Sequence, residues 1–132
     1  MVEPGPHRPH RDPEELRDLR PLEALEFEQH EGLALGEKLG LAPESLLPTL
    51  MAGAAGNWFL DKRGATMLRD EFAPGFKCAH MLKDLRIVQA IARDAGIRSP
   101  TIDQAAADYA ELVERGQGDL DTSALITLKR DG

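Results

Sequence analysis

The side chains best suited to chemistry gather in one stretch, residues 73–85, which reads APGFKCAHMLKDL. His80 precedes Asp84 by four residues, so on a helix the two side chains share a face and can hydrogen-bond. Such a pair could work as an acid–base couple, although a plain surface contact is the commoner result of this spacing. Lys77, three residues before His80, belongs to the same polar face.

The helix that must position these groups is predicted by a turn and an apolar stripe. Pro74-Gly75 forms the turn and delivers Phe76 to the start of the helix. Apolar residues then recur at every third or fourth position: Cys78, Leu82, Leu85, Val88, Ala92 and Ala95. One apolar and one polar face suit a helix that lines a cleft, but periodicity alone favours an ordinary surface helix.

Composition narrows the class of protein. The 132 residues are enough for one domain, and with 5% aromatics its core must be built from aliphatic side chains. A net charge of -7 without a concentrated basic patch argues against nucleic acid as a partner. No apolar run is long enough to span a membrane, so we expect no membrane partner. Cys78 is the only cysteine, which favours a reducing, cytoplasmic location.

The rest of the sequence predicts an all-α chain. Residues 1–11, with His7 and His10, are expected to form a disordered, solvated arm, and a single helical domain is expected over 12–132. No stretch alternates like a strand. Glycine, proline and capping signals predict a helix that starts near Asp12 and further helices from Leu22 to about Leu39, from Pro43 to Met51, within 61–72, over 78–95 and after Ser99-Pro100. Asp121 is expected to cap a last short helix.

Several packing expectations follow from single residues. Trp58, the only tryptophan, is expected to anchor part of the core together with Phe59. Asn57 is expected to cap the turn that follows it. In the helix before them, Leu35 and Leu39 are candidate packing contacts. The chain contains no glycine-rich nucleotide cradle, no P-loop and no serine nucleophile elbow.

Six short pieces of the sequence carry a resemblance when they are taken in order. They are 31–41 (EGLALGEKLGL), 53–58 (GAAGNW), Phe76, Lys83-Asp84-Leu85, Ala95-Gly96-Ile97 ahead of Ser99-Pro100, and Gly116-Gln117-Gly118 leading to Asp121-Thr122-Ser123-Ala124. In this order and spacing, over about 22–130, the chain resembles the C-terminal helical domain of the β-hydroxyacid dehydrogenases. This is the 3-hydroxyisobutyrate dehydrogenase group of the 6-phosphogluconate dehydrogenase-like superfamily, so the resemblance implies an orthogonal multi-helix bundle.

The resemblance also implies a function. Such enzymes pass a hydride between NAD or NADP, held on a Rossmann domain, and a short hydroxy acid, and their helical domain closes the cleft and forms most of the dimer. By position, Phe76 and Lys83 would approach the cofactor, while Asp84 and Asn57 would line the substrate cleft. The plain alternative is that Lys83 and Asp84 only form a surface ion pair.

The chain also departs from this family. It contains no Rossmann domain, and the family's catalytic lysine and paired asparagines would fall near Glu15 and Asp18-Leu19, so no catalytic residue is assigned. We therefore expect a stand-alone domain that is inactive by itself. It would be part of a split or truncated oxidoreductase, homodimeric, with the Rossmann domain possibly on a separate chain. The alternative is a non-catalytic homodimeric or partner-binding helical module.

Overall fold

The computed structural model describes residues 26–53 and 56–131. Within these ranges the regular structure is helical, as predicted, and the one β-type pairing is an isolated bridge between Lys77 and Asp121. The elements are α2 (Glu26–Lys38), α3 (Pro43–Ala52), α4 (Trp58–Leu68), α5 (Cys78–Asp94), α6 (Pro100–Glu114), the 3-10 helix η2 (Thr122–Leu125) and α7 (Ile126–Arg130). The predicted arm over 1–11 and the helix start near Asp12 lie outside the described residues.

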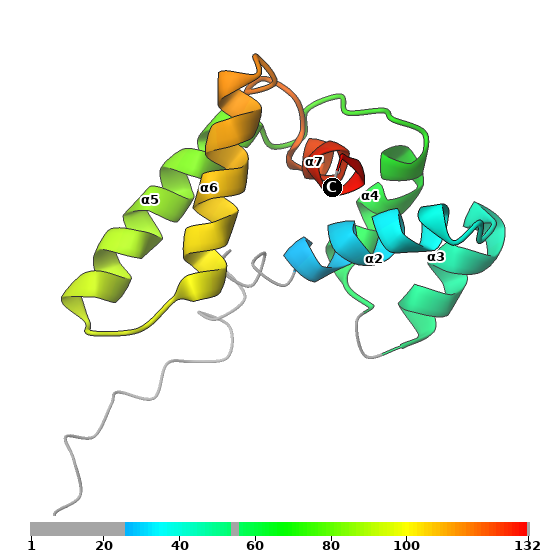
Figure 1. The fold of residues 1–132 in the computed structure, drawn as a ribbon, viewed down its shortest axis with the longest axis horizontal. Helices are drawn as coiled ribbons and strands as arrows, with labels where there is room; N and C mark the ends of the chain where they lie inside the picture. The colour runs from blue at the N-terminus through cyan, green and yellow to red at the C-terminus, as the bar shows by residue number, and fades with distance from the viewer. Residues whose placement is uncertain (1–25, 54–55, 132) are drawn as a thin grey trace, which may run out of the picture.

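The helices form two groups, each with its own apolar core (Figure 1). Helices α5 and α6 lie side by side, and with η2 they bury one core, which includes Cys78, Leu82 and Tyr109. Helices α2, α3 and α4 enclose the other, which includes Leu33 and Leu60. The end of the chain joins the two groups, as Figure 1 shows for α7, because η2 contacts α4, α5 and α6 while α7 packs on α2.

Glycine and proline mark the helix boundaries, as the sequence predicted. Pro43 and Pro100 lie in the first turns of α3 and α6. Helices α5 and α6 end just before Gly96 (φ 69°) and Gly116 (φ 80°), whose left-handed backbone costs a glycine little. None of the helices in the described part of the chain is both long and apolar enough to cross a membrane.

The prediction that Trp58 anchors the core is wrong, because its side chain is 69% exposed. Phe59 and Leu60 are buried instead. Successive residues on a helix point about 100° apart, so a helix that turns Phe59 and Leu60 inward leaves Trp58 on the outside. Leu35 and Leu39 are likewise exposed, because α2 buries its neighbouring positions Leu33 and Ala34.

Candidate functional site

The start of α5 has the two faces that the sequence predicted. Cys78, Leu82 and Leu85 are buried on the packing face, together with Met81. Phe76, just before the helix, is half-buried against the same core, and its ring lies against His80, with ring centroids 6.0 Å apart and planes tilted by 59°.

Lys83 and Asp84 lie on the outer side of α5. The Lys83 Nζ lies 3.4 Å from the Asp84 Oδ1, and the two side chains are 68% and 45% exposed. Among the described residues, the Asp84 carboxylate therefore pairs with Lys83, and not with His80 as the acid–base alternative required. An exposed pair of this kind contributes little to stability, so both side chains are available for contacts with a ligand.

Asn57 lies on a different element from the other predicted site residues. It caps α4, where its Oδ1 accepts a hydrogen bond from the Leu60 N–H at 2.8 Å, as the capping prediction required. Phe76, Lys83 and Asp84 belong to α5 and the turn before it. The structure thus places two of the four residues on α5 and a third in the turn before it, and the place of Asn57 in a substrate cleft stays a prediction.

The turn that carries Phe76 is held by a buried carboxylate that sequence reasoning had assigned only to a helix cap. Asp121 does cap η2, because its Oδ2 accepts from the Ser123 N–H at 3.0 Å and from the Ser123 hydroxyl at 2.6 Å. Its Oδ1 also accepts from the backbone N–H groups of Gly75 (3.0 Å) and Phe76 (3.1 Å). The Arg63 guanidinium lies 3.6 Å from the same Oδ1.

This environment keeps Asp121 ionised. Burial raises the pKa of the Asp121 carboxyl, but the hydrogen bonds from Ser123, Phe76 and Gly75 outweigh it, and the pKa ends below its usual value. A Cβ at Gly75 would meet the end of the Arg63 side chain, which is flexible enough to move aside. The turn before α5 therefore depends on Asp121, with the Arg63 guanidinium beside it.

The amide groups at the start of α5 are already used within the chain. The N–H of Cys78 donates to the Leu120 carbonyl and that of Ala79 to the Gly118 carbonyl, both at 2.9 Å. A helix N-terminus commonly binds phosphate through such amides, but here they are occupied. An anionic ligand at this end of α5 must therefore rely on side chains such as Lys83.

Cys78 is not a nucleophile in this structure. Its side chain is fully buried, and its thiol donates to the Asp121 backbone carbonyl with Sγ and O 3.2 Å apart. Burial, with a smaller effect of the Asp121 charge, raises the pKa of the Cys78 thiol to about 12. The reactive thiolate is therefore absent near neutral pH, in line with the lack of activating residues in the sequence.

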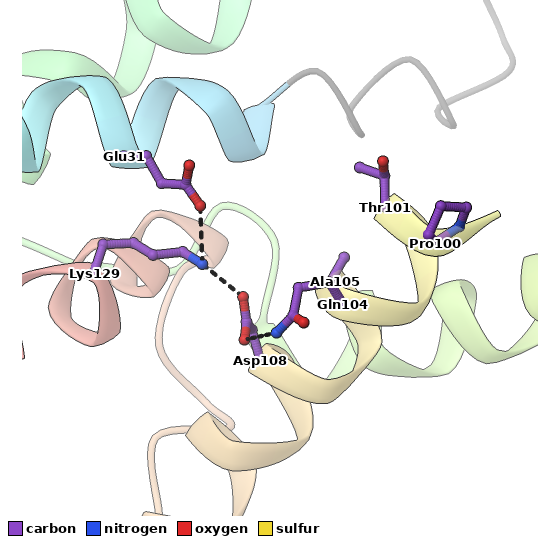
Figure 2. Close-up of a pocket in the computed structure, with 7 residues that line it drawn as sticks. All are labelled: Glu31, Pro100, Thr101, Gln104, Ala105, Asp108 and Lys129. Atoms are coloured by element: carbon purple, nitrogen blue, oxygen red, sulfur yellow. Dashed lines mark hydrogen bonds and ion pairs between the residues drawn. The ribbon is translucent and has the colours of Figure 1, made fainter. Parts of the chain in front are cut away.

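A second polar cluster lines a hollow of about 330 Å³ between α2, α6 and α7. Figure 2 shows its ion pairs, in which Lys129 Nζ lies 2.7 Å from Asp108 Oδ2 and 3.4 Å from Glu31 Oε1. Burial lowers the pKa of the Lys129 ammonium, but the bond to Asp108 and the two negative charges outweigh it and raise the pKa. Lys129 therefore stays charged and paired, which makes it a poor substitute for the proton-transferring lysine of the family.

Arg130 makes a similar connection one residue later. Its guanidinium binds both carboxylate oxygens of Glu37, at 2.8 and 2.9 Å, and also contacts the Met67 carbonyl and Asp70. With Lys129, it fastens α7 to α2, α4 and α6. Sequence reasoning missed both residues, since two basic side chains at the end of a short helix give no sign of partners up to 98 positions away, the separation of Lys129 from Glu31.

The predicted catalytic-lysine position near Glu15, and Asp18-Leu19, lie outside the described residues. What the described part offers is an all-helical bundle in which an aromatic ring precedes α5 and an exposed lysine–aspartate pair lies on its first half. This is the arrangement expected for the C-terminal helical domain of a β-hydroxyacid dehydrogenase-type protein. Residues 27–129 match the model of a family described as NAD-binding of NADP-dependent 3-hydroxyisobutyrate dehydrogenase, and the chain belongs to this family.

Known relatives agree with this assignment. An uncharacterized oxidoreductase of Synechocystis is 36% identical over 101 residues, covering 76% of this chain and 34% of that protein. A probable 3-hydroxyisobutyrate dehydrogenase-like protein of Arabidopsis thaliana is 36% identical over 96 residues, covering 73% of this chain and 29% of that protein. The chain thus spans about a third of the length of the curated relatives that it matches.

A solved structure supports the fold. The 3-hydroxyisobutyrate dehydrogenase of Mycobacterium tuberculosis, in a structure with L-serine, superposes with a TM-score of 0.73 at 27% identity. The match covers 89% of this chain and 42% of that one.

Proposed function

We propose that this chain supplies the cofactor-closing helical part of an NAD(P)-dependent oxidoreductase of the 3-hydroxyisobutyrate dehydrogenase type. In this proposal a Rossmann domain, carried by the same protein or by a separate chain, binds the nucleotide, and the 132 residues alone do not turn over substrate. The observation that carries the proposal is the placement of Phe76 just before α5 and of the exposed Lys83 on its first half, within residues that match an NAD-binding family.

The side chains suit an NAD(P) cofactor. Among the described residues the Lys83 ammonium pairs with Asp84, which is itself nearly half exposed, so the ammonium can meet a negatively charged or amide-bearing ligand. Phe76 offers a half-buried ring to a flat nicotinamide. Asp84, and by resemblance Asn57, would line the substrate side. The bound cofactor would supply the hydride acceptor or donor, while these residues only bind and orient.

No described residue is proposed as the proton donor or acceptor at the hydroxyl. Cys78 is buried and protonated, and Lys129 is held charged by Asp108. This is why we expect the purified chain to show no turnover with NAD(P)H and a panel of semialdehydes. Clear turnover would show that a proton-transferring group exists and would overturn this part of the proposal.

Cofactor binding is the direct test. NADH and NADPH are titrated into the purified chain while the fluorescence of Trp58 and of the nicotinamide is followed. We expect weak, saturable binding that Lys83→Ala abolishes. Lys62→Ala is the matched control, because Lys62 forms a similar exposed pair with its neighbour Asp61 at 3.5 Å but lies on α4. No binding up to millimolar cofactor, or equal loss in both variants, would contradict a cofactor role for Lys83.

A homodimeric or partner-binding module is the second candidate, and it rests on a different observation. The described surface exposes large apolar side chains: Ile87, Ile91 and Ile97 in and after α5, and Leu35, Leu39, Leu41 and Trp58 in the other group of helices. Exposed apolar side chains in such numbers favour burial against another surface. Light scattering at micromolar concentration tests this, and a clean monomer would count against a homodimer.

A further inference from the structure

We propose that Asp121 is a positioning residue for the cofactor side of α5, acting through the backbone of Gly75 and Phe76. This inference rests on the proposed function of Phe76 and Lys83. Nothing in the resemblance assigns a role to this carboxylate, and its sequence position predicts only a cap for η2. The structure shows a second use, because one oxygen serves the cap and the other serves the turn that carries Phe76.

The Phe76 backbone is fixed from both sides by the same short segment. Its N–H donates to the Asp121 Oδ1 at 3.1 Å, and its carbonyl accepts from the Thr122 N–H at 2.9 Å. The hydrogen bond to Thr122 joins two backbone groups, so it does not depend on which side chains stand at these positions. The bonds to Oδ1 require an acceptor of this length at position 121, which makes Asp121 the side chain that sets the backbone direction at Phe76.

The geometry separates this role from capping. The two oxygens are divided between tasks: Oδ1 faces Gly75 and Phe76, while Oδ2 faces Ser123. Asp121 does not reach the outer side of α5 itself, since its side chain is 2% exposed. Any effect of Asp121 on cofactor binding must therefore act through the position of Phe76. The Phe76 ring lies against His80, which precedes Lys83 and Asp84 by one helical turn.

Three variants divide the two tasks. Ser123→Ala removes the hydroxyl bond to Oδ2 and leaves the Oδ1 bonds intact. Asp121→Ala removes both sets, and Asp121→Asn keeps an oxygen for only one of them. Binding of NADPH is measured without urea, at a temperature at which circular dichroism shows that each variant is fully folded. Under these conditions a loss of stability alone does not change the dissociation constant.

We expect Ser123→Ala to bind NADPH like the wild type, Asp121→Ala to bind about tenfold more weakly, and Asp121→Asn to lie between them. Wild-type affinity in folded Asp121→Ala would overturn the positioning role, and so would an equal loss in Ser123→Ala. If Asp121→Ala does not fold, Asp121→Asn decides the question together with amide exchange: wild-type affinity in a variant whose Gly75 and Phe76 amides exchange faster would overturn the role.

A second readout needs no cofactor. Amide hydrogen exchange at Gly75 and Phe76, and the ring contact between Phe76 and His80 seen by NMR, report the turn directly. We expect faster exchange and a weaker ring contact in Asp121→Ala but not in Ser123→Ala. If the wild type does not bind NADPH, the proposed function fails, and this readout alone judges the positioning role. An unchanged turn in folded Asp121→Ala would then refute it.

Discussion

Asp121 should make the stability of the domain depend on acid pH, and Asp121→Asn should remove that dependence. At neutral pH the carboxylate accepts four hydrogen bonds from Gly75, Phe76 and Ser123. An amide can keep two of them at best, so the variant loses two bonds to a charged acceptor. At about 1.5 kcal/mol net for each hydrogen bond to a charged group, the variant should be about 3 kcal/mol less stable than the wild type.

The pH dependence has a defined sign. The folded-state pKa of Asp121 lies below its unfolded value, so its contribution is complete above the ordinary carboxyl pKa of about 4. The contribution is lost as the pH falls through the lower, folded-state pKa, because the protonated carboxyl is neutral like the amide. The difference in unfolding free energy between wild type and variant should therefore shrink in acid.

The assay is urea unfolding, followed by circular dichroism in steps from about pH 7 down to about pH 3. Asp119→Asn is the matched control, because Asp119 lies two residues away in the same loop but its side chain is 90% exposed, paired only with Lys77 at the surface. We expect this control to stay within about 0.5 kcal/mol of the wild type. A variant at Asp121 that matches the wild type near neutral pH, or a difference that persists unchanged in acid, would refute the reasoning.

Other perturbations should have distinct effects. Lys129→Met leaves the Asp108 carboxylate, which is 14% exposed, without its closest cation, and should lower the free energy of unfolding by about 2 kcal/mol in urea. An unchanged urea midpoint would show that this pair does not hold the two groups of helices together. Phe59→Ala should cost about 3 kcal/mol while Trp58→Ala stays within about 0.5 kcal/mol, and similar losses would contradict the outward placement of Trp58. Cys78 should react with a thiol reagent only after urea is added, and rapid reaction in the native protein would contradict its burial.

Local signals in the sequence were sufficient for the helices and their ends. Glycine, proline and capping residues act on their immediate neighbours, so Gly96, Gly116 and Pro100 could be assigned from the sequence alone. The packing face of α5 was predictable over the first half of the helix, where Cys78, Leu82 and Leu85 are buried, whereas Ala95 at the end of the predicted stripe is exposed. These signals do not identify a family, which was predicted from the order of the six sequence pieces. The all-α fold and the family are both confirmed.

The wrong prediction at Trp58 has a physical origin. Where apolar residues follow one another directly, as in Trp58, Phe59 and Leu60, the sequence does not say which of them faces the core. The choice is made by how the helix packs on its neighbours, which places Phe59 and Leu60 beside Leu33 of α2 in one core. The size and aromatic character of Trp58 favoured a place in the core, but Trp58 lies on the face of α4 that points away from it.

The partners of charged residues were beyond local reasoning for a different reason. Asp121 meets Gly75 across 46 positions and Arg130 meets Glu37 across 93, distances over which spacing carries no information. Yet both contacts involve the same stretch of chain, which begins at Asp121 and ends with α7. Within it, Leu125 enters the core of α5 and α6, while the next residue, Ile126, enters the core of α2, α3 and α4. The segment that fixes the turn before α5 thus also connects the two groups of helices. The position of Phe76 on the proposed cofactor side should therefore depend on the contacts that hold α7 against α2.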